Sequence, residues 1–384
     1  MNISDKKIII VTHYLVYGAP QALRDYLITN KIKKLLFIAH PLLSEGDPSY
    51  VEKIEKGVIK KRSKSKKRFK ILFVNYFFDV YLTLKWILEE KEKFDLFVGV
   101  NCLNAFVGVI LKKVKFVKKI VFYTIDYVPN RFDNKILNNI YHYMDKFCLK
   151  NADETWNVSP RIAEGREKLK GLKQKLYNRQ KVVPIGVWID RVKRLSFEKI
   201  RKHQLLFVGH LLEKQGIQLV LEAIPEIVKF IPDFHFLIIG DGNYKSSLVE
   251  RAKRLDIGRY ITFTGWIKNR DDLDKLMGDS ALAAAIYNKE LDSYTYYADP
   301  TKLKDYLSAG LPVILTDLSY NAKEIAENGC GVIVNYDKKE VAAVIINLMK
   351  DENKLKVYRE NALKYIKQFD WRLIFENNLK RVLL

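Results

Sequence analysis

The chain has 384 residues, a length that favours two domains over one small module. Hydrophobic residues make up 48% of it and charged residues 29%, which excludes wholesale disorder and the fibrous and low-complexity classes. Lysine and arginine total 67 against 45 acidic residues. The resulting net charge of +22 predicts an anionic partner such as phosphate, nucleic acid or a membrane surface, without choosing among them.

The apolar run that starts at Lys7 is followed by polar groups rather than by a small-residue cleavage site, so it predicts a buried strand and not a signal peptide. The most hydrophobic stretch, residues 71–88, is interrupted by Asn75, Asp79 and Lys85. A spanning helix needs about 20 predominantly apolar residues, so we expect no segment to cross a membrane.

Short apolar runs recur along the chain, with helical patterns between them. The runs are Lys7–Thr12, Leu35–Ala39, Leu96–Val100, Ile120–Thr124, Lys181–Pro184, Gln204–Val208, Phe234–Ile239, Ile261–Phe263, Ala281–Ile286 and Pro312–Leu315. Continuous apolar strands that alternate with helices predict parallel sheets covered on both faces, which is an α/β architecture.

The charged stretch Asp190–His203 separates two series of strands and lacks a clear apolar face, so we place a domain boundary near residue 190. The predicted domains are residues 1–190 and 191–368. Residues 369–384 form a last aromatic-rich helix, which either packs back on the first domain or serves as an ordinary core helix.

The three cysteines, Cys102, Cys148 and Cys330, show no Cys-x-x-Cys spacing. They predict neither a disulfide framework nor a zinc cluster, and they favour a reducing, cytoplasmic setting.

The segment Leu205–Gly216 combines an apolar strand with a polar loop that begins at Gly209 and leads into a helix. Ligands of doubly wound folds bind beyond the carboxyl ends of strands, so His210, Lys214 and Gln215 are placed to meet a phosphate. An ordinary strand-to-helix turn is the alternative interpretation.

Two further turns follow strands. The first contains Gly240 and Gly242 without a third glycine, and we interpret it as a phosphate or sugar loop rather than a dinucleotide fingerprint. The second ends beside Trp266, whose indole either stacks on a base or closes the core; we favour packing.

The segment Tyr297–Leu315 predicts a helix followed by a strand. Asp299 can cap the helix, and Thr301 and Lys302 occupy its first turn, where N–H groups, a hydroxyl and an ammonium can converge on a diphosphate. Asp305, one turn later, can accept a hydrogen bond from a ribose or sugar hydroxyl. The alternative is an ordinary capped helix.

Four segments together resemble the C-terminal half of GT-B glycosyltransferases in order and spacing. They are Phe207–Ala223, Ile238–Gly242, Phe263–Gly265 and Lys302–Ile314. The chain resembles glycosyltransferase family 4, also called glycosyl transferases group 1, over about residues 180–375. Asn151–Ser159 and Val183–Val187 carry a looser match in the first half.

The resemblance implies two Rossmann-like domains that face a cleft, with a nucleotide-sugar donor on the second and an acceptor on the first. It implies transfer from a UDP- or GDP-sugar to a glycan or lipid-linked acceptor, with retention and without a clear protein nucleophile, in polysaccharide or glycoconjugate biosynthesis. No cofactor or metal is expected. The residues expected at the nucleotide-sugar are Gly18, Gly209, His210, Lys214, Gln215, Gly240, Ile267, Asp299, Thr301, Lys302, Leu303 and Asp305.

The chain departs from the family pattern at several of these positions. His210 and Gln215 stand where members often carry arginine and lysine, and Tyr297 and Asp305 stand where members tend to have two glutamates. The first carboxylate is therefore missing or comes from the loop at residues 290–292.

Asp126 follows a predicted strand, near where related enzymes place an acceptor-side histidine or aspartate. We expect it to contact the acceptor hydroxyl or to act as a base; a cap or turn aspartate is the alternative. His13 and His40 lie near other strand ends and receive no role. Asp272 and Asp274 form an Asp-x-Asp pair that we interpret as a helix start rather than a metal site.

A basic tract precedes the apolar residues 71–78. Its basic residues are Lys60, Lys61, Arg62, Lys64, Lys66, Lys67, Arg68 and Lys70. Basic residues beside apolar ones suit an anionic membrane surface, so we expect peripheral attachment to the inner face of the membrane. A solvated loop followed by a core helix is the alternative.

Two other functions remain open. One is a sugar-nucleotide epimerase, and the other is a nucleic-acid or membrane-binding protein on an inactive GT-B scaffold. The helix start at Thr301 and Lys302 would be superfluous in a nucleic-acid-binding protein, so no nucleic acid is expected as a partner.

Overall fold

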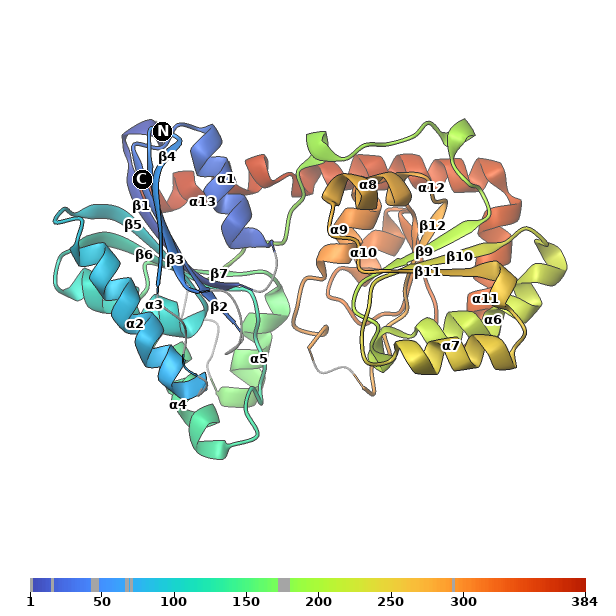
Figure 1. Cartoon of the computed structure of the whole chain (residues 1–384), viewed down its shortest axis with the longest axis horizontal. Helices are drawn as coiled ribbons and strands as arrows, with labels where there is room; N and C mark the ends of the chain where they lie inside the picture. Colours follow the sequence, from blue (N-terminus) through green and yellow to red (C-terminus); the bar gives the residue numbers. More distant parts are fainter. Residues whose placement is uncertain are drawn as a thin grey trace. The chain divides into compact units, whose positions relative to one another are not determined.

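The computed structural model describes residues 3–14, 17–42, 48–65, 69, 72–171, 180–291 and 294–384. The chain divides into two compact units, each built on one sheet with helices on its faces (Figure 1). Unit 1 comprises Met1–Pro184 and Trp371–Leu384, and unit 2 comprises Ile185–Asp370. The predicted α/β architecture of two parallel-sheet domains is confirmed.

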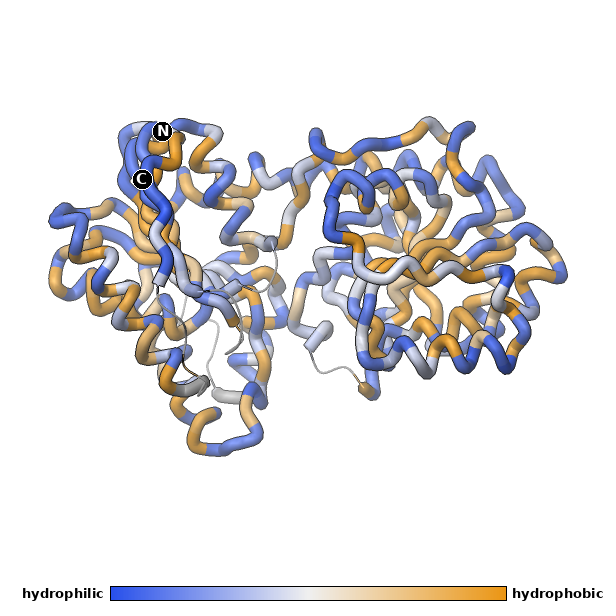
Figure 2. Tube along the Cα trace, in the orientation of Figure 1, coloured by the Kyte–Doolittle hydropathy of each residue, from blue (hydrophilic) through white to orange (hydrophobic). Residues whose placement is uncertain are grey.

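Unit 1 contains an eight-stranded sheet in the order β4-β3-β2-β1-β5-β6-β7-β8. Its strands are β1 (Lys7–Tyr14), β2 (Lys34–Pro41), β3 (Tyr50–Glu55), β4 (Val58–Lys64), β5 (Phe94–Val100), β6 (Val117–Thr124), β7 (Glu154–Asn157) and β8 (Gln180–Val182). Its α-helices are α1 (Ala19–Thr29), α2 (Leu72–Leu88), α3 (Asn101–Lys113), α4 (Lys135–Asn151), α5 (Pro160–Lys170) and α13 (Trp371–Leu383). The central strands are almost wholly buried and apolar, which is why they form the core of the unit (Figure 2).

Strands β3 and β4 run antiparallel at one edge of this sheet, so the expectation of parallel strands alone is wrong there. The reason is a tight turn at Lys56 and Gly57, both with positive φ (49° and 75°), which joins two strands as a hairpin. The charged strand β4 is exposed along most of its length. Lysines on an edge strand discourage pairing with another chain.

Unit 2 contains a six-stranded, wholly parallel sheet in the order β11-β10-β9-β12-β13-β14. Its strands are β9 (Gln204–Val208), β10 (His235–Ile239), β11 (Ile261–Gly265), β12 (Leu282–Ala285), β13 (Val313–Leu315) and β14 (Gly331–Ile333). Its α-helices are α6 (Ile217–Phe230), α7 (Lys245–Arg254), α8 (Arg270–Gly278), α9 (Thr301–Ser308), α10 (Ala322–Glu327), α11 (Lys338–Lys350) and α12 (Glu352–Tyr365).

The chain enters unit 2 earlier than the expected boundary near residue 190. The Val187 N–H donates to the Phe369 carbonyl at 2.9 Å, which fixes the entering chain beside the chain that leaves the unit. The last helix, α13, belongs to unit 1, where Phe375 lies 5.7 Å from the Tyr26 ring of α1 and Arg381 pairs with Glu154.

The hydrophobic stretch 71–88 forms α2, a helix with one buried polar row. Asn75, Asp79 and Thr83 are at most 1% exposed, whereas Phe77 and Tyr81 on the same helix are more than half exposed. In the described part of the chain, the helices are all too short or too polar to span a bilayer.

Candidate functional site

Glycines bring three loops of unit 2 together at the carboxyl edge of its sheet. Gly209, Gly240 and Gly265 follow or end β9, β10 and β11, and each has a positive φ. The Gly240 N–H donates to the Gly265 carbonyl at 2.9 Å, and a Cβ on Gly240 would lie 1.9 Å from the Gly209 carbonyl oxygen. The backbone can approach this closely only without side chains, so the loops present peptide groups at this edge.

Lys302, in the first turn of α9, reaches toward the same loops. Its Nζ lies 3.0 Å from the position of a Cβ on Gly209 and donates a 2.6 Å hydrogen bond to Gln215 Oε1. It also lies 4.3 Å from the centroid of the Phe207 ring. The structure therefore brings Gly209, Gln215 and Lys302 together, although 87 positions separate Gln215 from Lys302 in the sequence.

The start of α9 adds backbone donors to this edge. Pro300 is the N-cap residue and makes no side-chain cap hydrogen bond, and Thr301 is exposed. The first N–H groups of a helix have no acceptor within the helix, and the positive end of the helix dipole lies there. The Leu303 N–H donates to the Pro300 carbonyl, and the Leu303 side chain is buried. An anion at this edge would meet these N–H groups and one ammonium.

Asp299 does not cap α9, so that expectation is wrong. Its side chain is fully buried and forms an ion pair with Lys304 at 3.2 Å. Burial raises the pKa of Asp299, while Lys304 opposes this shift. A carboxylate engaged in this way is not available to a ligand.

Asp305 is held by an arginine of the neighbouring helix α8. Its Oδ1 accepts from Arg270 Nη2 at 2.7 Å, and Arg270 also pairs with Asp274 at 2.7 Å. Asn269 caps α8 by accepting from the Asp271 N–H, so the Asp-x-Asp segment lies in the first turns of a helix, as interpreted. In the described residues, no three histidine, cysteine or acidic side chains are grouped to hold a metal.

Trp266 is not a packing residue, contrary to the interpretation from sequence. The indole is 52% exposed and stacks on the His210 ring, with centroids 5.8 Å apart and planes at 29°. Nearby, Lys214 Nζ lies 4.9 Å from the centroid of the Tyr294 ring. Ile267 is partly buried against the core of unit 2. Aromatic and basic groups thus line the approach to the glycine loops.

The remaining predicted residues lie in unit 1. Gly18 is the N-cap residue of α1, and its N–H donates to Gln21 Oε1 at 3.0 Å. Asp126 is exposed just after β6. The surrounding protein raises the pKa of this carboxyl by partial desolvation, and Arg131 acts in the opposite direction.

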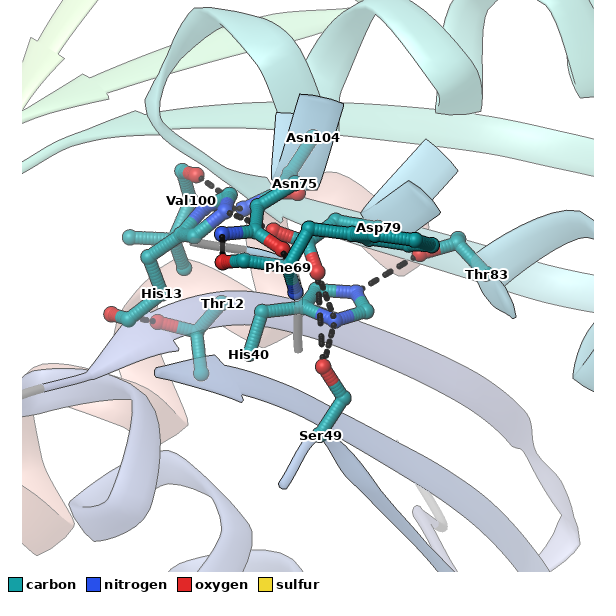
Figure 3. A network of polar contacts seen from close by, with 10 residues as sticks. All are labelled: Thr12, His13, His40, Ser49, Phe69, Asn75, Asp79, Thr83, Val100 and Asn104. Atoms are coloured by element: carbon teal, nitrogen blue, oxygen red, sulfur yellow. Dashed lines mark hydrogen bonds and ion pairs between the residues drawn. The ribbon is translucent and has the colours of Figure 1, made fainter. Parts of the chain in front are cut away.

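The carboxyl edge of the unit 1 sheet contains a buried polar cluster that sequence reasoning left unassigned (Figure 3). Asp79, on α2, lies between two histidines: its Oδ2 is 3.1 Å from His13 Nε2 and its Oδ1 is 3.2 Å from His40 Nδ1. The Ser49 hydroxyl donates to the same carboxylate at 3.3 Å. Its members come from β1, β2, α2 and the residue before β3, so no local motif could have revealed it.

The cluster fixes the tautomer of His13. Its Nδ1 is 3.1 Å from the amide nitrogen of Asn104, which also donates to the Val100 carbonyl. Because that amide donates, Nδ1 accepts, and Nε2 carries the proton that Asp79 accepts. Both ring nitrogens are thus used within the protein, which makes the cluster a positioning element at the ends of β1 and β5.

Four residues of the basic tract lie on β4. Lys60, Lys61 and Arg62 are exposed, and so is Lys64. Arg62 lies 4.3 Å above the Tyr50 ring of β3. The other four, Lys66, Lys67, Arg68 and Lys70, lie outside the described residues.

Two parallel-sheet units, the second with a glycine-lined edge beside a helix start, are the architecture of the GT-B fold. The crystal structure of Anabaena Alr3699/HepE in complex with UDP has a TM-score of 0.73 over 98% of this chain and 99% of that one, at 15% identity. WaaG, a glycosyltransferase involved in lipopolysaccharide biosynthesis, has a TM-score of 0.63 over 98% and 99%, at 17% identity. These likenesses show the fold.

Sequence comparisons point to glycosyltransferases. The model of glycosyl transferases group 1 matches residues 190–365. An uncharacterized glycosyltransferase of Methanocaldococcus jannaschii is 24% identical, over 79% of this chain and 76% of its own length. Phosphatidyl-myo-inositol mannosyltransferase of Mycolicibacterium smegmatis is 24% identical, over 44% of this chain and 42% of its own length. Residues 190–365 are thus similar to the glycosyl transferases group 1 family, the family that the sequence resembles.

Proposed function

We propose that this protein transfers a sugar from a UDP- or GDP-sugar, bound by unit 2, to a glycan or lipid-linked acceptor in polysaccharide or glycoconjugate biosynthesis. The observation that carries the proposal is the position of Lys302 between Gly209 and Gln215, in the first turn of α9. HepE, which shares the fold, has been crystallised with UDP and with UDP-glucose. These complexes support a nucleoside diphosphate at this site.

Departure of a nucleoside diphosphate creates negative charge on its phosphate oxygens. Preorganised N–H dipoles and a cation stabilise such charge more than they stabilise the bound substrate. In this account, Lys302 supplies the cation, and the N–H groups of Thr301 and Lys302 supply the dipoles. We propose reaction with retention and without a protein nucleophile.

The ribose and the base of the nucleotide would contact side chains outside the phosphate site. Asp305, held in place by Arg270, presents a carboxylate to accept from ribose hydroxyls. The exposed face of Trp266 offers a stacking surface for the base. On unit 1, we propose that Asp126 acts as the base that removes the proton from the hydroxyl of the sugar-accepting substrate. A carboxylate with a raised pKa is a stronger base.

A thermal-shift panel of UDP, GDP and their sugars tests the donor site, because a ligand that binds only the folded state raises the unfolding temperature. We expect one nucleotide series to stabilise the wild type and to lose this effect in Lys302→Ala. Lys229→Ala, an exposed lysine at the end of α6, is the matched control and should keep the wild-type response. Failure of every nucleotide to stabilise the wild type, at low and moderate salt, would contradict the proposal.

We also propose that unit 1 binds an anionic membrane surface. In the same unit as the basic strand β4, α2 exposes Val74, Phe77 and Tyr81, whose spacing places them on one face of the helix. On α4, Ile136, Ile140 and Tyr143 are likewise exposed at helical spacing. Basic residues together with exposed apolar stripes suit the boundary between acidic headgroups and acyl chains.

Sedimentation with vesicles tests this attachment. Replacing Lys60, Lys61, Arg62 and Lys64 by glutamine should weaken binding to vesicles with anionic lipid by roughly 100-fold or more, since each basic residue contributes about 1 kcal/mol. The matched control replaces four unit 2 lysines, Lys338, Lys339, Lys350 and Lys354, and removes the same charge. Equal loss in both variants would show an effect of net charge alone and would remove the proposed surface.

A further inference from the structure

Unit 2 contains a buried ion pair that the donor-site account does not use. The side chains of Asp299 and Lys304 are both 0% exposed, with Lys304 Nζ 3.2 Å from Asp299 Oδ1. Among the described residues, Lys304 Nζ finds no acceptor with hydrogen-bond geometry. A buried ammonium with so few partners is costly and calls for an explanation beyond packing.

The pair contacts both ends of unit 2. The N–H of Ile185, the first residue of the unit, donates to Asp299 Oδ2 at 2.8 Å. Lys304 Nζ lies 3.9 Å from the centroid of the Phe369 ring, one residue before the unit ends. The hydroxyl of Tyr320 adds a 3.4 Å hydrogen bond to Asp299. The two charges therefore hold the places where the chain enters and leaves the unit.

The same pair brackets the start of α9. Asp299 precedes the helix by two residues, and Lys304 lies in its first turns, so Thr301 and Lys302 lie between the two charges in the sequence. Lys302 extends elsewhere, to Gln215 and Gly209. The backbone of residues 299–304 thus connects the proposed phosphate site to the ion pair, and the pair contacts Ile185 and Phe369.

We propose that Asp299 and Lys304 are positioning residues that link occupation of the phosphate site to the entry and exit segments of unit 2. A diphosphate bound at the start of α9 restrains Asp299 and Lys304, which in turn restrain the Ile185 amide and the Phe369 ring. This inference rests on the proposed nucleotide donor, and UDP, or GDP where only GDP stabilises the protein, is the probe for both.

Hydrogen exchange of the segment 185–189 in the full chain tests the link. With UDP at 100 times its Kd, we expect exchange of the wild-type segment to slow by up to about 100-fold, because opening must release the ligand. Strand β14, at the sheet edge, reports general stabilisation of unit 2 and should slow less. Nucleotide binding without extra protection of 185–189 would overturn the link alone, whereas absence of binding by both UDP and GDP would overturn the proposed function as well.

The neutral pair Asp299→Asn with Lys304→Met separates a positioning role from a structural one. It removes both charges together, so neither is left buried alone. We expect UDP to bind this variant while protection of 185–189 falls to that of β14. Retention of the extra protection would overturn the proposal. Tyr320→Phe removes one hydrogen bond to Asp299 and leaves both charges in place. In this variant we expect UDP to protect 185–189 more than β14, but by less than in the wild type.

Discussion

The carboxyl edges of the two sheets are built in opposite ways. In unit 2, backbone turns at Gly209 and Gly240 pack on each other, and the edge presents peptide groups and a lysine. In unit 1, the corresponding edge is filled by side chains, with Asp79 enclosed by two histidines (Figure 3). The edge in unit 2 suits a phosphate group, which all nucleotides have. The edge in unit 1 instead fixes the positions of the strand ends by specific side-chain contacts.

The largest effect should come from the backbone contact in unit 2. Gly240→Ala places a Cβ against the Gly209 carbonyl at a φ of 143°, so we expect a loss of about 3 kcal/mol or more in the free energy of unfolding of this unit. Urea unfolding measures it. Gly258→Ala, where a Cβ meets nothing within 4 Å, should stay within about 0.5 kcal/mol of wild type; similar losses in both would disprove the close approach.

The second largest loss of stability should come from the polar cluster of unit 1. Asp79→Ala removes the buried carboxylate that accepts from His13 and Ser49 and lies beside His40, so we expect unit 1 to lose about 2–4 kcal/mol. Unit 2 offers a matched pair at the surface, where Asp233 accepts from His203 and is 74% exposed. Asp233→Ala should cost less than about 1 kcal/mol. An equally small cost for Asp79→Ala would show that the buried cluster does not hold the strand ends.

These two regions also explain what the sequence could reveal. The glycine turns and the start of α9 are local: each occupies a few adjacent residues after a strand, so the pattern placed them correctly. The cluster of unit 1 joins His13 to a carboxylate 66 positions away, and no spacing rule covers such a distance. The exposure of Trp266 was missed for the same reason, because only the fold shows that its neighbour is His210.

The missed strands have other causes. Strand β14 has only three residues, too few to establish a period. Strand β4 is mostly charged and exposed, so it resembled a solvated loop. The buried role of Asp299 was unpredictable, because it depends on Lys304, Ile185 and Tyr320 meeting in three dimensions.

A smaller, pH-dependent effect should arise in unit 1. Burial alone would raise the pKa of Glu90, but Lys34 and Lys53 more than offset this, so the pKa lies below its ordinary value. The carboxylate therefore contributes stability above its unfolded pKa, and this stability is lost as the pH falls through the lower folded pKa. Glu90→Gln should cost about 1–3 kcal/mol at pH 7. The difference from wild type should shrink in acid; a difference independent of pH down to about 3 would contradict this account.

A crystal structure of the protein with UDP-glucose tests the central claim most directly. The account predicts the diphosphate at the start of α9, within hydrogen-bond distance of Lys302 Nζ and the first N–H groups of the helix, and close to Gly209. A nucleotide bound with its phosphates away from α9, or bound only to unit 1, would contradict it.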